Sequence, residues 1–387
     1  MRDTVARIIA QAINDAETSV VTNVPGFGGT QVFEAFVEIS RKAFPCSFHE
    51  EVAYSIAHGA SLVGRRSATL IKAHGLAKAA NSLVDSLFAG TTAGFLILVF
   101  DDKRGKHSDS IFDVAEFIQG LRIPCQILQV SEVYDDVLSA FARSEELHLP
   151  IVLLVDSDDL GRTASYTPAR RSTSAPNYQR DVAQHLVSPP LAEHQREILD
   201  AKLSNQDWRA LRKPALPTIP EDLPEAWQET ARSYVQLFTV FQKLRGEIVF
   251  GDTGISSLFA FPPYHGVDVL TYMGGSVPLA IGAYLAGYHD AWAVTGDFSF
   301  VAAGHLGLVE AMQRGIPLRV LIFHNGKAEA TGGQIIPARI FEQILKPYEL
   351  CVRNIRNPQN AGEIEAVLME ANRAEEMRIV VADYCGS

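Results

Sequence analysis

Short apolar runs alternate along the chain with longer segments in which apolar residues recur at every third or fourth position. Runs of this length are typical of buried β-strands, and the longer spacing is typical of amphipathic helices. Regular alternation of the two predicts an α/β protein with parallel, doubly wound sheets. The predicted strands cover residues 18–22, a short segment around Cys46, 68–72, 94–100, 125–130, 151–155, 247–251, 292–295, 318–323 and 378–383.

A proline-rich stretch divides this pattern into two halves. At 387 residues, the chain is long enough for two domains that each bury a core of their own. Alternating strands and helices fill residues 1–156 and again residues 231–387, whereas residues 157–230 are rich in proline and polar side chains. We therefore expect two doubly wound domains, over 1–156 and 231–387, and between them a linker that carries one or two helices.

Two predicted strands in the second half end in polar side chains. Asp297 follows the run 292–295, and Asn325 follows the run 318–323. A helical pattern separates the runs, so we expect parallel strands with both residues at the carboxyl edge, where such sheets bind ligands. Ser299 is expected to cap the helix, whose first N–H groups would face an anion. A carboxylate and an amide oxygen together suit a Mg²⁺ ion that bridges to phosphate oxygens.

This arrangement resembles the Gly-Asp-Gly and Asn-Asn signature of thiamine-diphosphate enzymes. Gly296 and Asp297 match its beginning and Asn325 matches its end, while Phe298 replaces the last glycine and His324 replaces the first asparagine. Neither replacement removes a side-chain ligand. The resemblance implies thiamine diphosphate and Mg²⁺ as cofactors, bound to a diphosphate-type domain in the second half. The alternative is a crossover in which the aspartate and the asparagine only cap helices.

The resemblance also implies a set of cofactor contacts. In the family the aspartate, the second asparagine and a main-chain carbonyl two residues later bind the metal, which gives Asp297, Asn325 and Lys327 here. A bulky apolar residue before two glycines supports the bent cofactor, and Met273 matches it, although a methionine is also ordinary core filling. The expected cofactor-binding residues are Thr253, Gly254, Met273, Gly275, Ser276, Gly296, Asp297, Phe298, Ser299, Asn325 and Lys327.

A glutamate pair opens a predicted helix in the first half. Residues 48–83 resemble the pyrimidine-domain segment of 2-oxoacid oxidoreductases of the indolepyruvate type. In that family a glutamate from the pyrimidine-type domain hydrogen-bonds the aminopyrimidine of the cofactor and promotes loss of its C2 proton. The resemblance assigns this role to Glu50 and makes Glu51 its neighbour. The alternative is a pair of solvated acids that favour a helix N-terminus.

Candidate substrate contacts cluster in two places in the first half. Lys72, His74 and Asn81 flank a predicted strand-to-helix turn, and His74 could also shuttle a proton because its ordinary pKa lies near neutrality. The loop with Asn23, Pro25 and Gly26 resembles the family loop that contacts the 2-oxoacid. Either group could supply donors to a carboxylate, although a lone histidine is more often structural. The preferred interpretation of the basic residues Lys103, Arg104, Lys106 and His107 is a solvated loop.

Composition limits the class of partner. The formal net charge of −11 argues against a nucleic-acid or anionic-membrane surface. The 4 cysteines are scattered, without the paired spacing of a zinc site, an iron–sulfur site or a disulfide framework. No apolar run approaches the roughly 18 residues of a membrane span. We therefore expect a cytoplasmic protein.

The motifs are most similar to the alpha subunit of indolepyruvate:ferredoxin oxidoreductase, including Thr331, Gly332 and Gln334, and they also resemble phosphonopyruvate and sulfopyruvate decarboxylases. The oxidoreductase's cysteine-rich ferredoxin module has no counterpart in this sequence. The resemblance therefore implies a non-oxidative 2-oxoacid decarboxylase or carboligase, a lyase or transferase working through an ylid and an enamine.

Two alternatives remain. One is the catalytic subunit of a 2-oxoacid oxidoreductase with a separate redox subunit, and the other is a cofactor-binding protein that has lost catalysis. Because the family places the glutamate and the diphosphate site on different domains, a homodimer or a dimer of dimers with shared active sites is expected. The side chain of the 2-oxoacid and the nature of any acceptor stay open.

Overall fold

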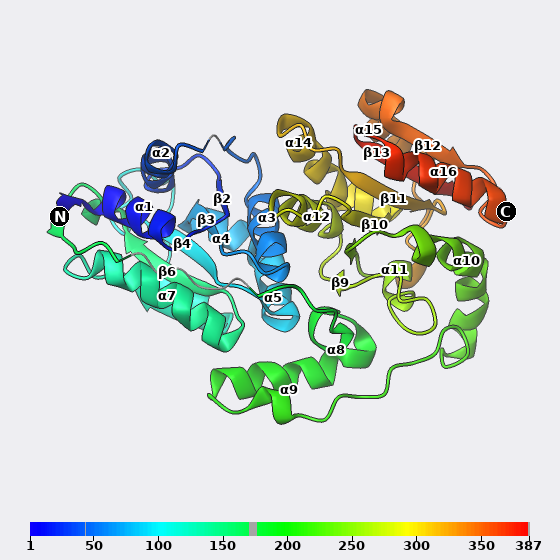
Figure 1. Cartoon of the computed structure of the whole chain (residues 1–387), viewed down its shortest axis with the longest axis horizontal. Helices are drawn as coiled ribbons and strands as arrows, with labels where there is room; N and C mark the ends of the chain where they lie inside the picture. Colours follow the sequence, from blue (N-terminus) through cyan, green and yellow to red (C-terminus); the bar gives the residue numbers. More distant parts are fainter. Residues whose placement is uncertain (43, 170–175, 386–387) are drawn as a thin grey trace. The chain divides into compact units, whose positions relative to one another are not determined.

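The computed structural model describes residues 1–42, 44–169 and 176–385. The chain forms two compact units (Figure 1). Unit 1 comprises Met1–Gln179 and Leu199–Trp208, and unit 2 comprises Arg180–Ile198 and Arg209–Ser387. The segment 157–230, expected as a linker, is thus divided between the units. In the described residues no helix is both long and apolar enough to cross a bilayer.

Unit 1 is built on a parallel five-stranded sheet with the order β2-β3-β4-β6-β5. Its strands are β2 (Val20–Asn23), β3 (Ser67–Lys72), β4 (Phe95–Asp101), β5 (Cys125–Ile127) and β6 (Ile151–Asp156). Its main helices are α1 (Val5–Asp15), α2 (Gly29–Ser40), α3 (Glu50–Leu62), α4 (Ala73–Lys78), α5 (Ala80–Ala89), α6 (Val114–Gly120) and α7 (Val133–Leu147). Every residue of β4 is buried, as expected for a parallel strand covered by helices on both faces.

The expected fold class is confirmed, and local details differ. No strand forms around Cys46, where the described residues between α2 and α3 are a loop; Pro45 has no N–H to donate to a sheet. Two helices, α4 and α5, follow β3 in succession and meet at Ala79. A two-stranded antiparallel pair, β1 (Arg2–Thr4) with β7 (Thr163–Ser165), was not expected.

Unit 2 contains a parallel six-stranded sheet with the order β12-β13-β11-β10-β8-β9. Its strands are β8 (Val249–Gly251), β9 (Val269–Leu270), β10 (Trp292–Gly296), β11 (Arg319–His324), β12 (Val352–Ile355) and β13 (Arg378–Asp383). Its helices include α8 (Val182–His185), α10 (Glu225–Leu244), α11 (Ile255–Leu258), α12 (Ser276–Leu285), α13 (Asp297–Ser299), α14 (His305–Gln313), α15 (Ala338–Leu345) and α16 (Ala361–Arg373). The residues of helix α9 (Ala192–Leu203) are divided between the units, up to Ile198 in unit 2 and from Leu199 in unit 1.

Aromatic packing under α10 fixes this helix on the sheet of unit 2. Phe241 meets Trp292 of β10 edge-on, with 5.5 Å between ring centroids, and Phe238 lies 5.6 Å from Phe323 of β11. All four side chains are buried, and such pairs contribute more than their buried area alone. The packing places Tyr234, one turn before Phe238, next to the end of β11, where its ring lies 5.6 Å from that of Phe323.

Candidate functional site

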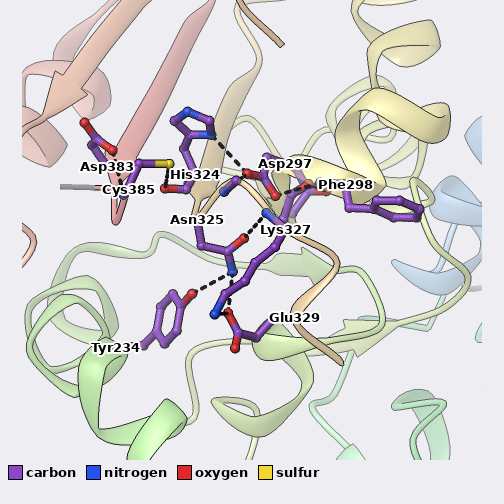
Figure 2. A network of polar contacts seen from close by, with 12 residues as sticks. Tyr234, Asp297, Phe298, His324, Asn325, Lys327, Glu329, Asp383 and Cys385 are labelled. Carbon is purple, nitrogen blue, oxygen red and sulfur yellow. Dashed lines mark hydrogen bonds and ion pairs between the residues drawn. The ribbon is translucent and has the colours of Figure 1, made fainter. Parts of the chain in front are cut away.

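The carboxyl ends of β10 and β11 bring Asp297 and Asn325 together, as expected. The two strands are parallel neighbours with Gly296 opposite Phe323, so the residues that follow each strand share one edge of the sheet. Asp297 Oδ2 lies 3.0 Å from Nδ1 of His324 and accepts the N–H of Gly326 at 2.7 Å (Figure 2). One carboxylate thus links the end of β10 to the turn after β11.

The Asp297 carboxylate is buried and held from three sides. Besides the two contacts on Oδ2, its Oδ1 accepts the N–H of Phe298 at 2.8 Å. A carboxylate has about four lone-pair positions, so these contacts leave room for one further partner, such as a metal ion. Its side chain is 2% exposed, and the three donors offset the cost of burial.

The Asn325 amide is held in one orientation. Its Nδ2 donates to Glu329 Oε2 at 3.2 Å and to the Tyr234 hydroxyl at 3.0 Å. Because a carboxylate can only accept, the amide nitrogen must face Glu329, and Oδ1 lies on the opposite side, where it accepts the N–H of Lys327 at 3.1 Å. Burial raises the pKa of Tyr234, so this hydroxyl stays protonated.

The turn after Asn325 places a third oxygen nearby. The Lys327 carbonyl accepts the N–H of Glu329 at 3.0 Å, and Lys327 also forms an isolated antiparallel bridge with Ile335. Its ammonium group lies 3.1 Å from Glu329 Oε2. A carbonyl oxygen has two lone pairs, so it can accept this hydrogen bond and still bind a cation.

Asp297, Asn325 and Lys327 line one pocket of unit 2. The other predicted cofactor-binding residues line it as well, except Gly275 and Ser276. The pocket is lined by Thr253, Gly254, Ile255, Met273, Gly296, Asp297, Phe298, Ser299, Phe323, Asn325, Lys327, Ala328, Glu329, Ala330 and Thr331. Met273 and Phe298 are more than a third exposed, so both present apolar surface to the pocket. The strand-end interpretation is confirmed in placing Asp297 and Asn325 at one edge of the sheet, and the binding of a cofactor there stays a prediction.

Ser299 does not cap the helix, contrary to the expectation. The helix begins one residue after Gly296, with Asp297 already in its first turn, and Ser299 has helical backbone angles. The side chain that accepts a first-turn N–H is instead Asp297, which bonds Phe298. The chain then continues through a wide turn over Phe300–Gly304 into α14.

Asp252, at the end of β8, supports the far wall of the pocket. Its side chain is fully buried, accepts the N–H of Ser276 at 2.7 Å and is hydrogen-bonded by the hydroxyl of Thr295. It therefore ties together β8, β10 and the start of α12, which is where Gly275 and Ser276 lie. Burial raises the pKa of Asp252 to about 6, since the hydrogen bonds only partly offset desolvation.

This shift predicts a pH-dependent contribution to stability. The folded-state pKa of Asp252 is above the ordinary value of 3.8. Between about pH 4 and pH 6 the folded chain therefore binds more protons than the unfolded chain, so the free energy of unfolding falls as the pH rises. We expect Asp252→Asn, whose amide oxygen can accept the Ser276 N–H and whose amide nitrogen can donate to the Thr295 hydroxyl, to lack a decrease on the order of 3 kcal/mol across this window. Urea midpoints at several pH values measure it, with Asp109→Asn at an exposed position as the control. Identical pH profiles for Asp252→Asn and the wild type would contradict the assignment.

In unit 1, Glu50 begins α3 and faces α4. Its carboxylate lies 2.8 Å from the ammonium of Lys78, and its side chain is 18% exposed. A Cβ added to Gly75 would lie 2.9 Å from Cγ of Glu50, so the glycine makes room for this carboxyl group. Glu50 is therefore an accessible acid in a fixed position.

The Glu51 carboxylate lies in a different environment from that of Glu50. Its Oε1 accepts the amide N–H of Asn81 at 3.3 Å, and burial raises its pKa. Burial, and then the nearby charge of Glu51, raise the pKa of Asp85 to about 6. Asn81, expected at the substrate, is thus paired with Glu51.

The other expected substrate residues lie around the ends of β2 and β3. Asn23 is buried at the end of β2, and Pro25 and Gly26 follow it in the loop, where a Cβ on Gly26 would lie 3.4 Å from the Lys72 side chain. The Lys72 ammonium donates to the carbonyl of His107 at 3.3 Å. The structure therefore brings Gly26 and Lys72 together.

His74 and the basic loop have protein partners. His74 Nε2 lies 2.8 Å from the Ser110 hydroxyl, and its ring meets Phe112 edge-on. In the loop that follows β4, Lys103 lies near Asp156, and Arg104 and Lys106 lie near Asp158. These exposed pairs fit a solvated loop.

Three further residues, which the sequence did not indicate, contact the candidate site residues. Tyr234 and Glu329 orient Asn325, and Lys78 pairs with Glu50. No periodic signal could have identified Tyr234, which lies 91 residues before its partner. Glu329 and Lys78 read as ordinary charged residues near turns.

A family model described as the C-terminal TPP binding domain of thiamine pyrophosphate enzymes matches residues 252–380. This stretch contains every residue expected to bind the cofactor. Among curated proteins, the indolepyruvate oxidoreductase subunit IorA of Methanothermobacter marburgensis is 28% identical over 149 residues, 37% of this chain and 24% of the relative. The same subunit of Archaeoglobus fulgidus is 26% identical over 153 residues, 38% of this chain and 25% of the relative. The match therefore spans about a quarter of these relatives.

Solved structures share the fold over nearly the whole chain. A thiamine diphosphate-dependent 4-hydroxybenzoylformate decarboxylase of Rhodococcus jostii RHA1 is 16% identical, with a TM-score of 0.69 and 98% of each chain covered. Benzoylformate decarboxylase from Polynucleobacter necessarius is 14% identical, with a TM-score of 0.63 and 98% of each chain covered. At these identities the likeness establishes the fold.

Proposed function

We propose that the chain is a Mg²⁺- and thiamine-diphosphate-dependent decarboxylase or carboligase of a 2-oxoacid, because residues 252–380 match the model of the C-terminal TPP binding domain of thiamine pyrophosphate enzymes. The observation that carries the proposal is the pocket where Asp297, Asn325 and Lys327 meet. The proposed active form is a homodimer or a dimer of dimers.

The residues of this pocket fit the proposed cofactors. A carboxylate oxygen, an amide oxygen and a carbonyl oxygen are the ligand types that Mg²⁺ prefers, and each retains a lone pair in the structure. Thiamine diphosphate supplies the electron sink for the carbanion that forms when carbon dioxide leaves. The proposed role of Met273 and Phe298 is to cover the cofactor and exclude water.

In unit 1 we assign proton transfer to Glu50. Its carboxylate is accessible, and Lys78 holds it in one position. Lys72 and Gly26 are the proposed contacts of the substrate carboxylate, since Lys72 provides a positive charge beside the loop after β2. His74 is a weaker candidate because Ser110 already occupies its Nε2.

Two reaction outcomes remain open, and different relatives support each. The solved structures named as decarboxylases support the non-oxidative outcome. The curated relatives named as indolepyruvate oxidoreductase subunits support an oxidative outcome, in which a separate redox subunit accepts electrons. The same pocket serves both outcomes.

The test of function is carbon dioxide release from a panel of 2-oxoacids with thiamine diphosphate and Mg²⁺, with and without an artificial electron acceptor. We expect release without an acceptor, and product analysis then separates an aldehyde from a carboligation product. Release only with the acceptor would support the oxidoreductase. No release under either condition, with the cofactor bound, would reject both.

Replacing Glu50 tests its assignment. We expect Glu50→Gln to lower turnover by roughly 100-fold or more, since general acid–base catalysis contributes about that much, while cofactor affinity stays near that of the wild type. Glu51→Gln is the matched control, because it removes the adjacent acid and relieves the repulsion of Asp85. Turnover and cofactor affinity are measured for both variants. Equal rates for Glu50→Gln and the control would exclude the role.

Replacing Asp297 tests the metal site. We expect Asp297→Asn to weaken Mg²⁺-dependent cofactor binding by roughly 10- to 100-fold, because the amide removes the negative charge at the metal. Tryptophan fluorescence during a Mg²⁺ titration at fixed thiamine diphosphate measures this. Glu376→Gln, whose side chain is 82% exposed, is the control. An Asp297→Asn variant that titrates like the wild type would show that the metal binds elsewhere.

A further inference from the structure

A second group of metal-binding side chains lies behind the pocket, at the ends of β11 and β13. These strands are parallel neighbours, and His324 and Asp383 face each other in register at their ends. Cys385 follows two residues later (Figure 2). One ligand atom from each of these three residues lies within 4.8 Å of the other two.

The backbone holds the cysteine in this position. The N–H of Tyr384 donates to the carbonyl of His324 at 2.7 Å, and the N–H of Cys385 donates to Asp383 Oδ1 at 2.9 Å. The Cys385 sulfur lies 3.6 Å from the His324 carbonyl oxygen. Gly326, at φ +70°, leaves space for the sulfur, since a Cβ there would lie 3.2 Å from it.

The histidine ring is also fixed. Its Nδ1 lies 3.0 Å from Asp297 Oδ2, and Phe341 stacks on the ring with 4.4 Å between centroids. A carboxylate oxygen only accepts, so Nδ1 carries a proton, and in the neutral ring the lone pair is then on Nε2. Metal-binding histidines commonly have such a carboxylate on the other ring nitrogen.

We propose that His324, Asp383 and Cys385 bind a thiophilic divalent cation of the Zn²⁺ class. Nitrogen, carboxylate oxygen and thiolate sulfur are the ligands that Zn²⁺ takes, whereas the pocket around Asp297 offers only oxygen. His324 and Asp383 also line a second cavity, whose charged residues are Glu342, Glu349, Lys346 and Arg356, and this cavity leaves space for a fourth ligand beside them.

Binding at this site acts on Asp297, a consequence that rests on the proposed function. A cation on Nε2 makes the Nδ1–H of His324 more acidic and strengthens its hydrogen bond to Asp297. The carboxylate then has less electron density for Mg²⁺. Bound Zn²⁺ therefore lowers the affinity for Mg²⁺ and thiamine diphosphate. They lower the affinity for Zn²⁺ by the same factor, because coupling between binding sites is reciprocal.

Cobalt titration tests the site without any need for activity. With excess Mg²⁺ present, we expect one Co²⁺ per chain and a thiolate-to-cobalt charge-transfer band that Zn²⁺ abolishes. Cys385→Ser removes the band, Asp383→Asn weakens binding on the order of 10- to 100-fold, and Cys125→Ser, at an exposed cysteine of unit 1, retains it. Circular dichroism checks that each variant is folded. No band in the wild type, or a band that survives in Cys385→Ser, would overturn the site.

A second measurement tests the coupling. We expect Zn²⁺ to raise the Mg²⁺ concentration needed for cofactor binding in the wild type and in Cys125→Ser, but not in Cys385→Ser. An effect of equal size in all three would overturn the coupling while the cobalt result stands. If thiamine diphosphate does not bind at all, the proposed function and the coupling fail together, and the cobalt measurement still decides the site.

Discussion

The buried carboxylate of Asp297 is the interaction on which the site of unit 2 depends. It accepts hydrogen bonds from the helix that follows β10, from the turn after β11 and from the ring of His324. Burying such a group is costly unless it is paired, so these three donors are required for the fold as well as for the site. They also fix the direction in which its remaining lone pair points. The pocket is therefore preformed around one carboxylate oxygen.

Much of this arrangement could be predicted, because it follows from local rules. An apolar run of strand length followed by a polar residue locates a strand end, and parallel neighbours bring their ends to one edge. That reasoning placed Asp297 and Asn325 at the same edge, and it also indicated Thr253 at the end of a neighbouring strand; Met273, which lines the same pocket, was indicated only by the resemblance. The predictions that failed, the strand at Cys46 and the cap at Ser299, relied on short segments, where a proline or a neighbouring acid outweighs propensity.

The supporting contacts could not be predicted, because they join distant parts of the chain. Tyr234 reaches Asn325 only because aromatic residues of α10 pack on the sheet. Asp252 reads in the sequence as part of a turn, and its role as a buried anchor follows from the meeting of β8, β10 and α12. The scattered spacing of the cysteines argued against a zinc site. Cys385 and His324 are 61 residues apart in the sequence, yet they meet because β11 and β13 are paired.

His324 is one of two positions at which this chain differs from the signature that it resembles, and this difference changes the available ligand atoms. An asparagine there could contact Asp297, but its short amide has no second nitrogen with a lone pair on the far side. One nitrogen of the imidazole ring is hydrogen-bonded to Asp297, and the other is available beside Asp383 and Cys385. The replacement thus retains the contact that orients the Asp297 carboxylate and adds a ligand position behind it. A replacement that retains the contact with Asp297 can in this way supply a ligand for the proposed second site, which acts through the same carboxylate.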